Sequence, residues 1–96
     1  MSRTLTQILE DVISRYGGEP VKNAVMYHLT RAFGLDPERM LEEPDRFTEA
    51  LRRIYGQFEE IIEKDICEEI INDRKLSSDA KTLKDLARDI KNSGSS

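Results

Sequence analysis

The longest hydrophobic pattern in the chain runs from Phe47 to Ile71 and repeats at helical spacing. On a helical wheel at 100° per residue, a first set of apolar residues falls within about 80° of Phe47. This set comprises Ala50, Leu51, Ile54, Tyr55, Phe58, Ile61 and Ile62. A second set lies on a face rotated by roughly 150–180° and comprises Ile66, Cys67, Ile70 and Ile71. The pattern predicts a long helix whose apolar face changes near Lys64 and Asp65.

The length of this segment raises a second question. A straight helix from Asp45 to Ile71 would be about 40 Å long, whereas a compact domain of this size is roughly 32 Å across. The segment therefore either bends, at Gly56 or near Asp65, or has its distal end covered by a partner. A glycine inside a helix costs about 1 kcal/mol relative to alanine, so Gly56 marks a bend or a close approach of another backbone.

Shorter helical patterns precede the long segment. Thr4 and Gln7 fit a capping box, and Gly17-Gly18 fits a helix stop. The first helix carries Leu5, Ile8, Leu9, Val12, Ile13 and Tyr16 on its apolar face. A second helix, from Pro20 to Gly34, carries Val21, Ala24, Val25, Leu29, Ala32 and Phe33.

Two more helices complete the expected fold. Asp36-Pro37 is typical of a helix start, and Pro44 limits that helix to about two turns. A last helix has Ser77 as its expected N-cap and carries Leu83, Leu86, Ala87 and Ile90. No strand-like alternation occurs. We expect an all-α, compact bundle of about five helices centred on the long segment, with one domain over residues 1–91 and a flexible tail over 92–96.

Composition narrows the class of protein. A single cysteine excludes an internal disulfide and favours the reducing cytoplasm. No apolar window reaches transmembrane length, so we expect a soluble protein without membrane contact. The net charge of -4 argues against binding to nucleic acid. Acidic residues concentrate in residues 59–73, and five arginines precede them: Arg31, Arg39, Arg46, Arg52 and Arg53. These are either solvated faces or opposite patches that meet across a subunit contact.

The sequence has no recognisable catalytic or metal-binding motif. One histidine and one cysteine cannot form a zinc or haem site, and neither a calcium loop nor a phosphate loop occurs. We therefore expect no cofactor, no metal and no enzymatic activity. Cys67 fits a small packing residue. His28 lies within the second apolar stripe and is either a packed histidine or, together with Tyr27, a pH switch or ligand contact.

Part of the chain resembles a known family. The stretches are Asn23-Ala24-Val25-Met26-Tyr27-His28-Leu29, then Gly34-Leu35, then Pro44-Asp45-Arg46-Phe47-Thr48-Glu49-Ala50-Leu51, then Ile54-Tyr55-Gly56. Together they cover about half the chain and resemble the Nitrosopumilus output domain class, small all-helical modules attached to, or encoded near, archaeal signalling proteins. The resemblance implies a regulatory or output role, no active-site residues, and a structural turn at Gly56.

These observations predict a non-enzymatic regulatory, signal-output or protein-interaction module. The rotated face suggests a homodimer or protein-partner interface formed by Ile66, Cys67, Ile70 and Ile71. The competing interpretation is that the last helix folds back over this face with Leu83, Leu86 and Ile90. The alternative function is that of a DNA-binding regulator of the helix-turn-helix type, because the first two helices are joined by a short turn.

Overall fold

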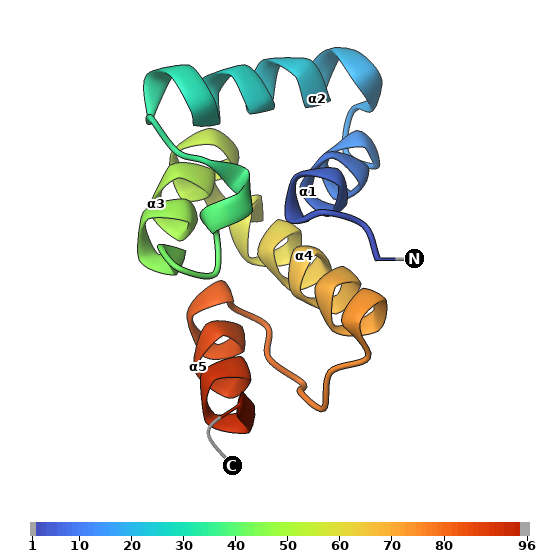
Figure 1. Cartoon of the computed structure of the whole chain (residues 1–96). Coiled ribbons are helices and arrows are strands. Elements are labelled where there is room, and N and C mark those ends of the chain that lie inside the picture. The colour runs from blue at the N-terminus through green and yellow to red at the C-terminus, as the bar shows by residue number, and fades with distance from the viewer. Residues whose placement is uncertain (1, 95–96) are drawn as a thin grey trace.

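The computed structural model describes residues 2–94, and its helices follow the order of the hydrophobic patterns (Figure 1). The α-helices are α1 (Leu5–Ser14), α2 (Gly18–Tyr27), α3 (Pro44–Tyr55), α4 (Glu59–Arg74) and α5 (Leu83–Gly94). A π-helical turn (His28–Ala32) extends α2, and 3-10 turns cover Pro37–Arg39 and Gly56–Phe58. The prediction of a compact all-α fold is confirmed.

Helix α1 lies in the core and begins as the sequence predicts. The Thr4 hydroxyl accepts a hydrogen bond from the backbone N–H of Gln7, and the Gln7 side chain accepts one from the N–H of Thr4. This reciprocal pair satisfies two donors that a helix start leaves free. The apolar face of α1 packs between α2 and α4 and buries Leu5, Ile8, Leu9, Val12 and Ile13.

Helix α2 is much less buried than its apolar stripe suggests. It lies at one end of the molecule and packs on α1, so its other sides face solvent (Figure 1). Val25 and Leu29 are buried, whereas Ala24, His28 and Ala32 are exposed. The next predicted helix is also shorter than expected. Its proline start forms a single 3-10 turn capped by the side chain of Asp36.

The long segment bends at Gly56. Helix α3 ends at Tyr55, and Gly56 adopts φ 59° and ψ −127°, a conformation that disfavours any side chain. A Cβ placed on Gly56 would meet nothing within 4 Å, so the backbone angle, and not close packing, calls for glycine here. Helix α4 then passes unbroken through Lys64 and Asp65.

The bend also rotates the buried face of the segment. The buried residues of α4 are Glu59, Ile62, Glu63, Ile66, Cys67 and Ile70, which form one continuous face. Phe58 and Ile61, which a straight helix would place in the core stripe, are exposed. The change of face therefore occurs at Gly56, and its prediction near Lys64 and Asp65 was wrong.

Helix α5 folds back onto α3 and α4 of the same chain. Leu83 and Leu86 are fully buried and Ile90 is partly buried against the core. This helix begins later than predicted, at Leu83, with Thr82 and not Ser77 as its cap. It also continues to Gly94, so residues 92–94 of the predicted tail are helical, and residues 95–96 lie outside the described part of the chain.

Ion pairs fasten the N-terminal segment to the end of α4. The Arg3 guanidinium lies 2.6 Å from Asp11, 2.8 Å from Glu69 and 3.4 Å from Asp73. Arg15 adds a second contact to Glu69 at 3.0 Å. These contacts join residues far apart in sequence. No helix within residues 2–94 combines the length and apolar character needed to cross a membrane.

Candidate functional site

The predicted interface on α4 is not a free surface in this structure. Ile66, Cys67 and Ile70 have no exposed surface, because α1 and α5 of the same chain pack against α4. Burial also raises the pKa of the Cys67 thiol to about 12, which makes it an inert packing group. The interface assigned to these three residues is therefore corrected: they belong to the core of a single chain.

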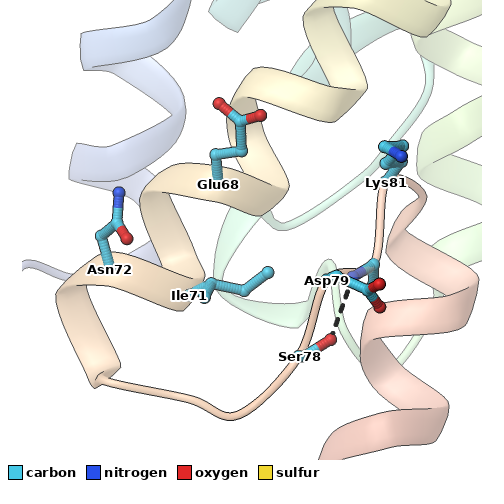
Figure 2. A pocket seen from close by; sticks show the side chains of 7 residues that line it. Glu68, Ile71, Asn72, Ser78, Asp79 and Lys81 are labelled. Carbon is cyan, nitrogen blue, oxygen red and sulfur yellow. Dashed lines mark hydrogen bonds between the residues drawn. The ribbon is translucent and has the colours of Figure 1, made fainter.

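Ile71, the fourth predicted interface residue, is partly buried at the edge of this core. Figure 2 shows its side chain extending from α4 toward the segment that carries Ser78. These residues line an open hollow of about 320 Å³ together with Glu68, Asn72, Asp79, Ala80 and Lys81. The Ser78 hydroxyl accepts a hydrogen bond of 3.1 Å from the N–H of Ala80, which fixes the turn on the far side. The segment before α5 thus covers part of Ile71.

Tyr27 and His28 both lie on the exposed side of α2 and its π-helical extension. The interpretation of His28 as a packed core residue was wrong, because only one edge of this helix reaches the core. Tyr27 is 63% exposed, and the Arg31 guanidinium lies 5.9 Å from the centre of its ring. A contact of this kind at an exposed site is worth about 0.5–1 kcal/mol. The hollows described in this section are lined by other residues.

An apolar surface is instead exposed where the chain bends. Phe58 is 58% exposed, Ile61 53% and Tyr16 39%. These residues surround a hollow of about 170 Å³ that Tyr55 and Ile62 complete, and we call the five residues the bend surface. It is built from the turn after α1, the end of α3, the 3-10 turn over Gly56–Phe58 and the start of α4. The hydrophobic periodicity did not predict the bend surface, because a helical wheel for a straight helix places Phe58 and Ile61 on the core-facing side.

The two tyrosines of the bend surface differ in their hydrogen bonding. The Tyr16 hydroxyl donates a hydrogen bond to the carboxylate of Asp65. The Tyr55 hydroxyl is buried and has no hydrogen-bond partner within residues 2–94. Burial raises the pKa of Tyr55, so this hydroxyl stays protonated. A buried hydroxyl without a partner costs about 1–3 kcal/mol.

Beside the bend surface, two carboxyl groups are buried at the start of α4. Glu59 is 1% exposed and Glu63 is 2% exposed. Glu63 Oε2 accepts hydrogen bonds from the Thr48 hydroxyl at 2.9 Å and from the backbone N–H of Leu83 at 2.6 Å. The Arg52 guanidinium lies 3.5 Å from Glu59 Oε1. The pair therefore joins α3, α4 and α5.

The carboxyl pair holds one proton at neutral pH. Burial, a hydrogen bond with Glu63 and the charge of Glu63 together raise the pKa of Glu59 to about 8, and the nearby charge of Arg52 acts in the opposite direction. Glu59 Oε2 receives no hydrogen bond from an N–H or O–H group within residues 2–94. A proton on this carboxyl group supplies the missing interaction, because Glu59 then donates to Glu63. Glu63 is the accepting member of the pair, since two donors already point to it.

A hollow of about 450 Å³ lies next to the carboxyl pair. The hollow is lined by polar and charged residues together with one isoleucine. They are Thr48, Arg52, Glu59, Glu60, Ile61, Glu63, Lys64, Lys81 and Thr82. No cluster of three or more metal-ligating side chains occurs in the described part of the chain. The predicted helix-turn-helix role also lacks a basic second helix: the lone lysine of α2, Lys22, is paired with Glu19 at 3.0 Å.

Comparison with protein-family models, with curated proteins and with solved structures found no match to this chain.

Proposed function

We propose that the protein is a non-enzymatic regulatory or signal-output module that acts by self-association, and that two copies meet at the bend surface. The observation that carries this proposal is the exposure of Phe58 and Ile61 side by side with Tyr16. Single exposed apolar residues are ordinary, but a contiguous apolar patch on a small domain indicates an interaction site.

A second copy of the chain is the partner that this surface fits. A two-fold contact brings the same patch of both copies together, so the patch must complement itself. The bend surface has an exposed Phe58 ring beside a hollow lined by Tyr16 and Tyr55, so each ring can enter the hollow of the other copy. An aromatic side chain buries roughly 150–250 Å² in such a contact. Glu60 and Lys64 lie on either side of Ile61, so charges of both signs surround the patch and the copies do not repel each other there.

The resemblance to the Nitrosopumilus output domain class supports the regulatory role. It implies a structural turn at Gly56, and Gly56 is the residue whose conformation exposes Phe58. The buried thiol of Cys67 fits a reducing compartment, so we place the protein in the cytoplasm. The proposal includes no catalytic step and no cofactor.

Molar mass in solution tests the proposal. We expect the wild-type protein to form a dimer whose fraction rises with concentration in analytical ultracentrifugation. Phe58→Ser should remain a monomer at the same concentrations, while its melting temperature in dilute solution stays close to that of the wild type, because Phe58 is exposed within one chain.

Tyr27→Ser is the matched control, since Tyr27 is an equally exposed aromatic residue outside the bend surface. This variant should dimerise like the wild type. A wild-type protein that stays monomeric up to its solubility limit would contradict self-association. Equal loss of dimer in both variants would contradict the assignment to the bend surface.

A further inference from the structure

We infer that α5 is a releasable arm, latched onto α3 and α4 by the single proton that Glu59 shares with Glu63. The inference goes beyond the proposed self-association, because it concerns the carboxyl pair and not the bend surface.

The attachment of α5 is peripheral. A non-helical segment over residues 75–82 leads from α4 to α5 (Figure 1). Among the described helices, α5 makes substantial contact only with α3 and α4. Its buried anchors are Leu83 and Leu86, with Ile90 partly covered. None of the substantial contacts of α5 is with α1 or α2. Helix α5 can therefore open locally without separating α1 from α2.

The first turn of α5 depends on a distant carboxylate. The backbone N–H of Leu83 is a donor that the start of a helix leaves free, and Glu63 accepts it at 2.6 Å. The negative charge of Glu63 is also favourable at the positive end of the α5 dipole. Thr48 of α3 donates to the same oxygen at 2.9 Å. One oxygen atom of Glu63 in α4 therefore accepts hydrogen bonds from both α3 and α5.

A second negative charge on Glu59 would disrupt this arrangement. The titratable groups around the pair are Arg52 of α3, Glu60 and Lys64 of α4 and Lys81 before α5, and the charges of both glutamates of the pair act on the Cys67 thiol of α4. Within residues 2–94 only Arg52 lies within ion-pair distance of Glu59, and its side chain is mostly exposed. One solvent-screened cation cannot balance two adjacent buried carboxylates. Glu63 also accepts the N–H of Leu83, so a second negative charge beside Glu63 disturbs the contact that holds the first turn of α5 and favours its release.

The contribution of the proton to holding α5 is lost as the pH rises to about 8. Burial and the neighbouring Glu63 raise the pKa of Glu59 to about 8. After release of α5, Glu59 has the ordinary glutamate pKa of about 4.3, so the closed arm is favoured progressively less between these two values. Release of α5 uncovers Leu83 and Leu86 on the arm and Cys67 on α4. The arm thus covers a second apolar surface. This surface includes Cys67, one of the four residues of the second apolar face that the sequence predicts.

Amide hydrogen exchange from pH 6 to pH 9.5, corrected for the intrinsic pH dependence of exchange, tests the inference. We expect the protection of α5 amides in the wild-type protein to fall by up to about tenfold per pH unit as the pH rises toward 8 and to level off above it, because release of α5 frees one proton only below the raised pKa of Glu59. The protection of α1 amides should stay constant over this range. Glu59→Gln should keep α5 protected throughout, because its amide donates to Glu63 and cannot ionise. Glu42→Gln makes the same change of charge at an exposed glutamate away from the pair and should behave like the wild type.

Two outcomes would overturn the inference: the same pH dependence of α5 in the wild type and in Glu59→Gln, or a parallel loss of protection in α1 and α5. If Glu59→Gln does not fold, the same exchange measurement on Thr48→Val at pH 6 tests whether the contacts of Glu63 hold α5. This substitution should lower α5 protection several-fold and leave α1 unchanged, and an unchanged α5 would contradict the latch. Dimerisation through the bend surface should be equal in the wild type and in Glu59→Gln at pH 7, so the two proposals can fail separately.

Discussion

Glu63 of α4 accepts a 2.6 Å hydrogen bond from the backbone N–H of Leu83, the first residue of α5. The start of α5 is thus completed by a side chain from another helix, in addition to the local cap from Thr82. Because this contact joins two elements, the stability of α5 depends on how the bundle packs and not on its own sequence alone.

The cap of α5 gives the first prediction. Thr82→Ala should lower the free energy of unfolding by about 1 kcal/mol, because the Thr82 hydroxyl accepts a hydrogen bond from the N–H of Asp85 at 3.1 Å. Ser77→Ala, at the cap position that the sequence suggested, should change stability by less than about 0.5 kcal/mol. Urea denaturation of the two variants decides between the positions. A larger effect at Ser77 would place the start of α5 earlier in the chain.

The bend gives the second prediction. Gly56→Ala should destabilise the protein by about 1–3 kcal/mol, because alanine is strained at φ 59° and ψ −127° although space for its methyl group is free. Gln57→Ala is the control, since Gln57 is exposed in the same turn. Thermal unfolding of both variants measures the difference. A Gly56→Ala variant as stable as the control would mean that the bend does not need this backbone angle.

The distal face of α4 gives the third prediction. Ile70→Ala should cost about 2–5 kcal/mol, because it removes a fully buried side chain from the core. Ile71→Ala, next to it but only partly buried, should cost clearly less. Both variants should keep the molar mass of the wild type. If Ile70→Ala retained full stability but changed the molar mass, Ile70 would be an interface residue after all.

Acid pH gives the fourth prediction. Hydrogen bonds from Arg3 hold the pKa of Glu69 below its ordinary value, with a smaller effect of Arg15, and the backbone N–H of Arg3 lowers the pKa of Asp73. A carboxyl group whose pKa is lower in the folded state stabilises the fold above its unfolded pKa. That contribution is lost as the pH falls through the folded pKa, so the melting temperature should drop between about pH 4.5 and pH 2.

Arg3→Gln should flatten part of this acid-side decrease, because it removes the guanidinium that lowers the pKa of Glu69, while the backbone N–H of residue 3 still lowers the pKa of Asp73. Arg39→Gln serves as the control, since Arg39 pairs only with exposed or partly exposed Glu42 and Glu43 on the surface. Melting temperatures measured from pH 6 to pH 2 give the comparison. An unchanged acid slope in Arg3→Gln would show that the ion pairs of Arg3 do not control the acid response.

The periodicity of the chain was sufficient to predict the all-α class and the approximate position of most helices. It was sufficient because each start and stop is decided within about one turn: Thr4 and Gln7 cap α1, Pro44 opens α3, and Gly56 interrupts the long segment. These are hydrogen bonds and backbone angles between near neighbours, which a sequence displays directly.

The tertiary structure alone decided which faces are buried. The direction of α4 depends on the exact φ and ψ of Gly56, and that angle moves Phe58 and Ile61 to the surface while Glu59 and Glu63 enter the core. Buried carboxyl groups are tolerated only because Thr48 and Leu83, distant in sequence, supply donors, and because one proton removes one of two charges. Local patterns carry no information about such partners, so both the bend surface and the carboxyl pair follow only from the folded chain.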